Sequence, residues 1–146
     1  MLVIEEGIRD AIVAHAKRDH PDEACGVVAG PVGADRPKRF VPMRNAAESR
    51  PTLYELESGD LFRLYRDMDD RGEEPVVVYH SHTGSPAYPS ATDRRLAAEP
   101  NAHYVLVSTR EHGNDPGPVE FRSFRILEGE VTEEDVRVVA SYGDAL

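Results

Sequence analysis

The feature that most constrains this fold is the run at residues 75–82, which reads PVVVYHSH. Three consecutive valines followed by a tyrosine are typical of a strand that is buried on both faces, in the middle of a sheet. The loop at residues 83–89 ends this run, because it contains Gly84, Pro86 and Pro89. The sequence therefore predicts one main sheet with residues 75–82 as a central strand.

Helical and strand-like patterns alternate around this central strand. Residues 7–20 show apolar positions at helical spacing, and Pro21 ends that pattern. Ser58 is predicted to cap a second helix over residues 59–72, and a short third helix is expected at residues 90–99. Strands are predicted at residues 24–30, 39–45, 52–56 and 103–110, with a terminal hairpin formed by residues 119–127 and 131–139. This order indicates an α/β or α+β fold.

Size and charge narrow the class of protein. The chain has 146 residues, so we expect residues 1–146 to form a single domain. Seventeen basic residues face 27 acidic residues, giving a formal net charge of -10. This balance argues against nucleic acid and anionic membranes as main partners, because both select basic patches. No apolar run is long enough to span a bilayer. The single cysteine, Cys25, rules out an intrachain disulfide and fits a cytoplasmic location.

Two histidines lie at the end of the predicted central strand. Residues i and i+2 of a strand point to the same face, about 6.6 Å apart along the chain, so His80 and His82 project together while Ser81 points away. Two imidazole nitrogens at about 2.0–2.1 Å from one ion form two corners of a tetrahedral zinc site. Asp93 is the nearest candidate for a third ligand. Ser90 and Asp93 also fit a helix capping box, S-x-x-D, and a helix that begins this way can still present Asp93 to a metal.

A hydrolytic metal site also needs a general base that takes a proton from water. Several acidic residues could serve as this base. Glu23 is the favoured candidate, because it stands just before the predicted strand at residues 24–30. The alternative for Glu23 is a solvated loop carboxylate. Cys25 offers a different chemistry, that of a thiol nucleophile beside a histidine. Its place in an apolar strand favours a buried cysteine that packs as a small hydrophobic residue.

The order and spacing of these residues resemble a known signature. Glu23, followed by His80-x-His82, seven residues, Ser90, two residues and Asp93, is similar to the JAMM motif of the MPN-domain metalloproteases. The resemblance covers almost the whole chain and implies a mostly antiparallel mixed sheet flanked by helices. It also implies that His80, His82 and Asp93 bind one Zn²⁺, that Glu23 is the general base, and that the Ser90 hydroxyl donates to the oxyanion.

Two longer segments extend the resemblance within this family. Residues 16–26, AKRDHPDEACG, and residues 79–93, YHSHTGSPAYPSATD, are similar to those of the actinobacterial Mec-type hydrolases. That resemblance implies an enzyme of cysteine biosynthesis. Its substrate would be a ubiquitin-like sulfur-carrier protein ending in Gly-Gly, and it would cleave the amide between the terminal glycine and an attached cysteine. Residues 39–56, which look edge-like, are the expected groove for the carrier's extended tail, through strand addition.

Other functions remain open at this point. A JAMM peptidase can also act on other prokaryotic ubiquitin-like proteins or on a carrier precursor. A thiol hydrolase would use Cys25 instead of a metal. A non-catalytic MPN scaffold would only bind partners, although scaffolding members typically lack the metal ligands. The oligomeric state is also open, with a homodimer among the alternatives.

Overall fold

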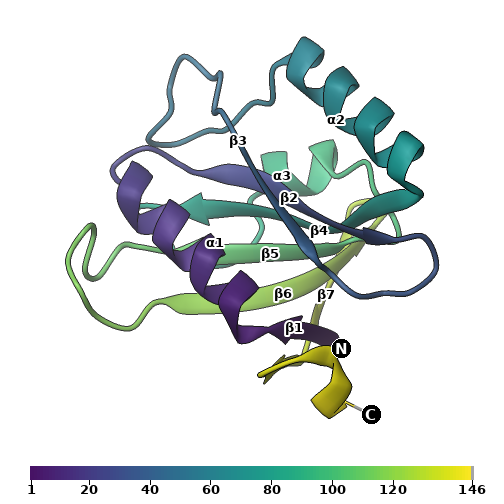
Figure 1. Cartoon of the computed structure of the whole chain (residues 1–146). Coiled ribbons are helices and arrows are strands. Elements are labelled where there is room, and N and C mark those ends of the chain that lie inside the picture. Colours follow the sequence, from purple (N-terminus) through teal and green to yellow (C-terminus); the bar gives the residue numbers. More distant parts are fainter. Residues whose placement is uncertain (146) are drawn as a thin grey trace.

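A six-stranded mixed sheet forms the centre of the structure, a computed structural model that describes residues 1–145 (Figure 1). Its strands are β2 (Cys25–Pro31), β3 (Arg39–Met43), β4 (Glu73–His82), β5 (His103–Ser108), β6 (Glu120–Leu127) and β7 (Glu130–Glu134). They follow one another in the order β3-β2-β4-β5-β6-β7. β4 and β5 pair in parallel, and the other neighbours pair antiparallel. The predicted mostly antiparallel mixed sheet is therefore confirmed.

The strand with the valine run, β4, lies in the interior of the sheet. Val76 and Val77 are 4% and 0% exposed, as expected for a strand covered on both faces. β2 runs along one side of β4 and pairs Cys25 with His80. β5 runs along the other side and pairs Ser108 with His82. The end of β4 that carries the histidines is therefore held between two neighbouring strands.

Helices cover both faces of this sheet (Figure 1). Successive residues of a strand point to opposite faces. Val28 of β2 packs in one core with helix α1 (Glu6–Asp19), whereas Val27 packs in another core with helix α2 (Ser58–Arg71). α1 and α2 therefore lie on opposite faces. The short helix α3 (Ala91–Leu96) follows the loop after β4. Ala97, directly after α3, packs against the core of Tyr104 and Leu106.

The two ends of the described chain meet in a separate pair of strands. β1 (Leu2–Glu5) pairs in parallel with β8 (Val136–Val139), and a short 3₁₀ helix, η1 (Tyr142–Ala145), follows. Leu2 and Ile4 of β1 join the core under α1. The predicted terminal hairpin is correct for β6 and β7. It is wrong beyond Glu134, because residues 136–139 leave the sheet and pair with β1.

The predictions for the region between β3 and β4 need two corrections. Residues 52–56 do not form the predicted strand; a single bridge joins Leu56 to Asn45. The Asn45 side chain takes up main-chain hydrogen bonds of this segment, so the segment needs no strand partner. Ser58 does not cap α2. The Glu57 carboxylate accepts from Gly59 N and Asp60 N and is the N-cap, while Ser58 is the first helical residue.

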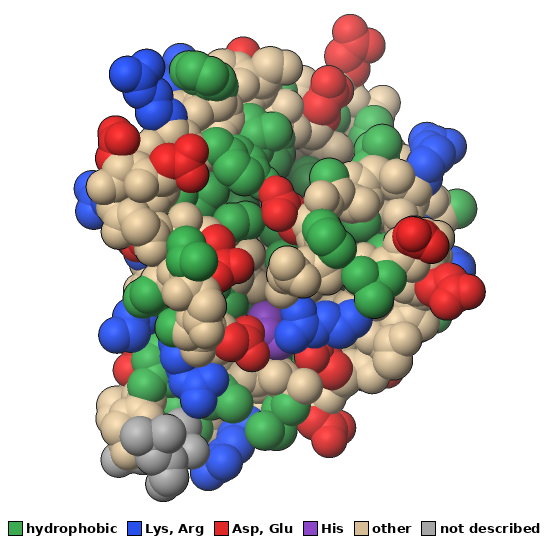
Figure 2. All heavy atoms as spheres, turned by 90° about the vertical axis from the view of Figure 1, so that its right-hand side faces the viewer, with side chains coloured by type: hydrophobic (Ala, Val, Ile, Leu, Met, Phe, Trp, Pro, Cys, Tyr) green, Lys and Arg blue, Asp and Glu red, His purple; other side chains and the backbone are tan. Residues whose placement is uncertain are grey.

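Smaller differences concern the ends of the other elements. α3 ends at Leu96, three residues before the predicted end of this helix. α2 ends as predicted near Gly72, whose φ of 67° is the left-handed conformation that glycine adopts at a helix end. No helix within residues 1–145 is long and apolar enough to cross a membrane. Figure 2 shows the face on the right-hand side of Figure 1, where acidic and basic side chains are intermixed.

Candidate metal centre

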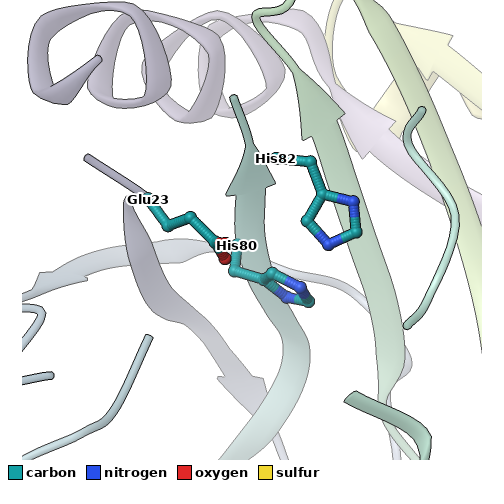
Figure 3. A group of neighbouring side chains, drawn as sticks. All are labelled: Glu23, His80 and His82. Atoms are coloured by element: carbon teal, nitrogen blue, oxygen red, sulfur yellow. The ribbon is translucent and has the colours of Figure 1, made fainter. Parts of the chain in front are cut away.

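The two histidines of β4 point into the same space (Figure 3). They lie on the face of the sheet that α2 and α3 cover, and Ser81 points to the opposite face, as strand alternation predicts. His80 is 2% exposed and His82 is 6% exposed, and their ring centroids are 5.1 Å apart. Two buried imidazoles on one strand face are thus available to a single ion.

Asp93 reaches the same histidines from the first turn of α3. Its Oδ2 lies 3.0 Å from His80 Nε2 and 3.1 Å from His82 Nε2. The predicted capping box is also present, since Ser90 Oγ accepts from Asp93 N at 3.0 Å and Asp93 Oδ2 accepts from Ser90 N at 2.8 Å. The cap and the histidine contact therefore coexist, and the cap determines where the carboxylate points.

Glu23 completes a group of four potential ligands. It lies just before β2 and is 5% exposed. One ligand atom from each of Glu23, His80 and His82 lies within 4.8 Å of the others (Figure 3). The structure therefore does not place Glu23 in a solvated loop. It brings Glu23, His80, His82 and Asp93 together and leaves two carboxylates available to the same pair of imidazoles.

The donor set fits a zinc ion. Two ligands at about 2.1 Å from one tetrahedral ion lie about 3.4 Å from each other. The two nitrogen–oxygen distances, 3.0 and 3.1 Å, are close to this value. Neither ring nitrogen of His80 has a hydrogen-bond partner among residues 1–145, although both are buried. His80 Nε2 lies 3.0 Å from Asp93 Oδ2, but the two atoms do not have the geometry of a hydrogen bond. This arrangement is expected when both atoms point toward one metal ion. A buried unpaired nitrogen is costly unless a metal uses it.

The tautomer of His82 suits metal binding. His82 Nδ1 lies 2.8 Å from the carbonyl oxygen of Pro86, which can only accept a hydrogen bond. Nδ1 therefore carries a proton. Nε2, 3.1 Å from Asp93 Oδ2, donates a hydrogen bond to that carboxylate when it is protonated and offers a lone pair to a metal when it is not. Burial alone would lower the pKa of His82, but Asp93 and the Pro86 carbonyl outweigh burial and raise it. For His80 burial dominates and lowers the pKa.

The surroundings shift the pKa values of the two carboxyl groups of the site in opposite directions. Burial raises the pKa of Glu23 to about 7; His82 opposes this shift and Asp93 adds to it. Burial also opposes ionisation of Asp93, but the imidazoles of His80 and His82 and the Ser90 N–H hold its pKa well below its usual range. Asp93 is therefore a permanent anion at neutral pH. Glu23 can take up and release a proton there, which is the property of a general base.

A cavity of about 510 Å³ opens beside these groups. Glu23, His82, Ser90 and Asp93 line it, together with the chain at residues 51–53 and 83–85. The Ser90 side chain is exposed to this cavity, and its Oγ accepts from Asp93 N, so its own proton remains free to donate. The cavity is large enough for an extended peptide end beside Glu23, His82 and Asp93.

Several residues of the site escaped the sequence-based prediction. Tyr54 stacks on the His80 ring, with centroids 4.4 Å apart and planes inclined by 26°. Asn45 hydrogen-bonds the main chain of Glu23. Asn45 and Tyr54 lie in segments that were predicted as strands, residues 39–45 and 52–56, and strand alternation does not indicate a contact with Glu23 or His80. Tyr88 lies in the loop between the two histidines and Ser90, but it does not line the cavity. Its ring packs edge-on against Phe124.

The fold and this site define a class of protein, the hydrolases in which two histidines and carboxylates gather at the end of a central strand. A family model described as prokaryotic homologs of the JAB domain matches residues 5–127. The chain therefore belongs to the prokaryotic JAB family, and it is a hydrolase of the JAMM type.

Individual relatives agree with this assignment. A protein of Mycobacterium tuberculosis (strain H37Rv) named CysO-cysteine peptidase is 59% identical over 97% of this chain and 94% of that protein. A Haloferax volcanii protein named desampylase is 36% identical over 68% of this chain and 75% of that protein.

Solved structures agree on the fold. The solution structure of a Desulfitobacterium hafniense protein superposes with a TM-score of 0.80 and 29% identity, covering 97% of this chain and 94% of that one. A JAB1/MPN domain protein from Archaeoglobus fulgidus superposes with a TM-score of 0.58 over 95% of this chain and 97% of that one. At 19% identity, the second likeness concerns the fold alone.

Proposed function

We propose that this protein is a zinc-dependent hydrolase that releases cysteine from a ubiquitin-like sulfur-carrier protein. It cleaves the amide between the carrier's C-terminal glycine and the attached cysteine. The observation that carries the chemistry is the position of Asp93 Oδ2 at 3.0 and 3.1 Å from the two histidine nitrogens, with Glu23 beside them. The substrate rests on the 59% identity to the mycobacterial CysO-cysteine peptidase.

His80, His82 and Asp93 would hold the ion, and Glu23 would stay free. Asp93 is the better third ligand because it is ionised at neutral pH, whereas the pKa of Glu23 is about 7, mainly through burial. Zn²⁺ in such a site supplies a Lewis acid that polarises the scissile carbonyl and lowers the pKa of a bound water to about 7. The remaining steps belong to side chains of this chain.

Glu23 and Ser90 divide these steps. Glu23 accepts a proton as a water oxygen attacks the carbonyl carbon of the terminal glycine. The carbonyl oxygen gains negative charge, and the Ser90 hydroxyl donates a hydrogen bond to it. The carbon–nitrogen bond then breaks, and Glu23 returns its proton to the amine of the departing cysteine. One water is consumed, and the products are the free carrier carboxylate and cysteine.

The carrier's tail would reach this site in an extended form. β3 is an edge strand of the main sheet, which supports the proposal that the tail adds to this edge. Residues 51–53, in the segment that follows β3, line the cavity. We place the enzyme in the cytoplasm, where the single cysteine would stay reduced.

A second substrate class is favoured by one specific observation. The Haloferax desampylase and a Thermus thermophilus protein, named as a probable TtuB-protein conjugate cleaving protease, are 36% and 28% identical to this chain. Conjugates of other ubiquitin-like proteins are therefore the alternative substrates. Equal amounts of a carrier–cysteine adduct and of a carrier linked to a lysine side chain, offered together, decide between them. We expect the cysteine adduct to disappear first, and preferential loss of the lysine conjugate would overturn the proposal.

The thiol-hydrolase alternative conflicts with the structure. Cys25 is 1% exposed. Burial, together with Asp19 and Glu23, raises the pKa of its thiol to about 12. Such a thiol is not ionised at neutral pH and cannot act as a nucleophile. A Cys25→Ala variant should therefore retain activity, and chelation followed by zinc addition should abolish and restore it. Loss of activity in a folded, zinc-loaded Cys25→Ala variant would revive the thiol mechanism.

A further inference from the structure

The main chain at Glu23 is held by the irregular loop between β3 and α2. Glu23 N donates to Arg50 O at 2.7 Å, and Glu23 O accepts from Asn45 Nδ2 at 2.9 Å. Glu23 lies outside the strands, so neither group is part of a sheet ladder. The loop at residues 44–56 therefore supplies both main-chain partners of the residue that carries the candidate base.

The residue after Glu23 is held from the other side by β4. Ala24 N donates to Ser81 Oγ at 2.8 Å, and Ser81 N donates to Ala24 O at 3.0 Å. Ser81 is 1% exposed and stands between His80 and His82 in the chain. The main chain next to Glu23 is thus fixed to Ser81, the residue between the two histidine ligands.

Both the nitrogen and the oxygen of the Asn45 side-chain amide form hydrogen bonds in this arrangement. Besides Glu23 O, its Nδ2 donates to Leu53 O at 2.9 Å. Its Oδ1 accepts from Ala47 N at 3.0 Å and from Glu55 N at 3.1 Å. Two donor hydrogens and two acceptor lone pairs are all that an asparagine side chain has. The reversed amide would set Nδ2 against two N–H donors, so the network also determines its orientation.

We propose that Asn45 and Ser81 are positioning residues, which fix the main chain around Glu23 so that its carboxylate stays beside the histidine pair. This inference rests on the proposed role of Glu23 as the general base. A glutamate side chain has three rotatable bonds, so the place of its carboxylate depends on how firmly its Cα is held. A displacement of about 1 Å in a catalytic group can cost roughly 100-fold in rate.

The test compares two Asn45 variants with a surface control on α1. Asn45→Asp keeps the acceptor that holds Ala47 and Glu55 but loses both donors, and Asn45→Ala loses the network without adding charge. Both should lower kcat about 10- to 100-fold on the carrier–cysteine adduct and change KM less than about 3-fold. Arg9→Ala is the control. It removes an exposed ion pair with Asp10, of 2.7 Å, on α1, which covers the face of the sheet opposite to the metal centre, so kcat should hardly change.

Ser81 provides an independent arm with its own rescue. Ser81→Ala should lower kcat as the Asn45 variants do, and Ser81→Thr, which retains the hydroxyl, should recover most of it. In every variant the visible absorption spectrum of the Co²⁺-substituted protein should match that of wild type. Changed spectra would mean that the substitution moved the histidines, and unchanged kcat in Asn45→Asp, Asn45→Ala and Ser81→Ala would overturn the inference.

A double-mutant cycle separates positioning from general stability. If Asn45 acts through Glu23, Asn45→Asp should cause no further loss in the slow residual rate of Glu23→Gln, measured with enzyme in large excess over the adduct. Equal losses in both backgrounds would show that Asn45 supports the fold alone. Full activity of Glu23→Gln itself would refute the proposed function. An inactive Glu23→Gln beside a fully active Asn45→Asp would refute only the positioning role.

Discussion

His82 and Asp93 meet across the loop at residues 83–89, with Nε2 of His82 and Oδ2 of Asp93 3.1 Å apart. The same oxygen accepts the main-chain N–H of Ser90 at 2.8 Å. One carboxylate oxygen therefore belongs both to the cap of α3 and to the candidate metal centre. The start of this short helix and the metal site are consequently coupled, and a change at Ser90 or Asp93 should affect both.

Asp93→Asn should weaken zinc binding far more than it weakens the fold. Asparagine keeps the size of the side chain and an oxygen for Ser90 N–H, but it carries no charge for the ion. We expect the zinc affinity to fall by more than the roughly 10- to 100-fold typical of changes around the ligands, as measured by competition with a chromogenic chelator. Glu23→Gln is the matched comparison and should change the affinity much less. The reverse result would make Glu23 the third ligand.

Substitutions of Ser90 should separate its two roles. Ser90→Ala loses the cap and the hydroxyl donor, so it should lower both the unfolding free energy, by about 1 kcal/mol, and kcat, by roughly 100- to 1,000-fold. Ser90→Asp should keep the cap without an O–H donor and lose only kcat. Ser90→Thr should retain both. Wild-type kcat in a folded Ser90→Asp variant would show that the hydroxyl does not assist the reaction.

The metal-free protein should lose stability as Glu23 ionises. Burial raises the pKa of Glu23 to about 7, above the ordinary 4.5, so the folded state binds the proton more tightly than the unfolded state. The contribution is favourable below pH 4.5 and is lost as the pH rises through 7. Glu23→Gln should therefore stabilise the zinc-free protein at pH 8 by up to roughly 3 kcal/mol, and hardly at all at pH 4.5. Urea unfolding at both pH values measures this, and equal effects would contradict it.

Glu134 should stabilise the fold without affecting catalysis. Buried His103 contacts Glu134 Oε2 through Nδ1 at 2.6 Å and Asp35 Oδ1 through Nε2 at 2.6 Å. Burial alone would raise the pKa of Glu134, but hydrogen bonds from His103 and Ser123 lower it to about 2. This contribution is present above pH 4.5 and lost as the pH falls toward 2.

Glu134→Gln tests the contribution of the cluster formed by His103, Glu134 and Asp35. His103 begins β5, whereas the metal centre lies beside its other end. The variant should lose roughly 2 kcal/mol of unfolding free energy at pH 7 and keep the wild-type kcat. The difference in stability should shrink below pH 4. A fall in kcat without a fall in stability would show that the two ends of the sheet are functionally linked.

The sequence predicted the candidate site better than it predicted the loop around it. Strand alternation, a local rule, predicts that His80 and His82 project together, whereas spacing alone makes Ser90 and Asp93 a helix capping box. The resemblance to the JAMM motif was needed to expect Asp93 as a ligand. The place of Glu23 beside them depends on the pairing of β2 with β4, and the resemblance to the JAMM motif was needed to expect it. The contacts of Asn45 could not be predicted from the sequence, because its partners lie up to 22 residues away in the chain and form no periodic pattern.

Two fold errors have the same kind of cause. Residues 52–56 alternate like a strand, but hydrogen bonds from the Asn45 side chain take the place of a strand partner. The pairing of β1 with β8 joins residues at opposite ends of the chain, and no local pattern shows which distant segments will meet. Sequence periodicity indicates which face of an element is buried, but it does not indicate its partner.

The most direct test of the account is the intact mass of a carrier-Gly-Gly-Cys adduct after incubation with the zinc-loaded protein. We predict that the adduct loses the mass of one cysteine residue, that free cysteine appears in equal amount, and that catalytic amounts of Glu23→Gln or of the metal-free protein leave the adduct unchanged over the same time. An unchanged adduct in the presence of folded, zinc-loaded wild-type protein would contradict the proposed reaction.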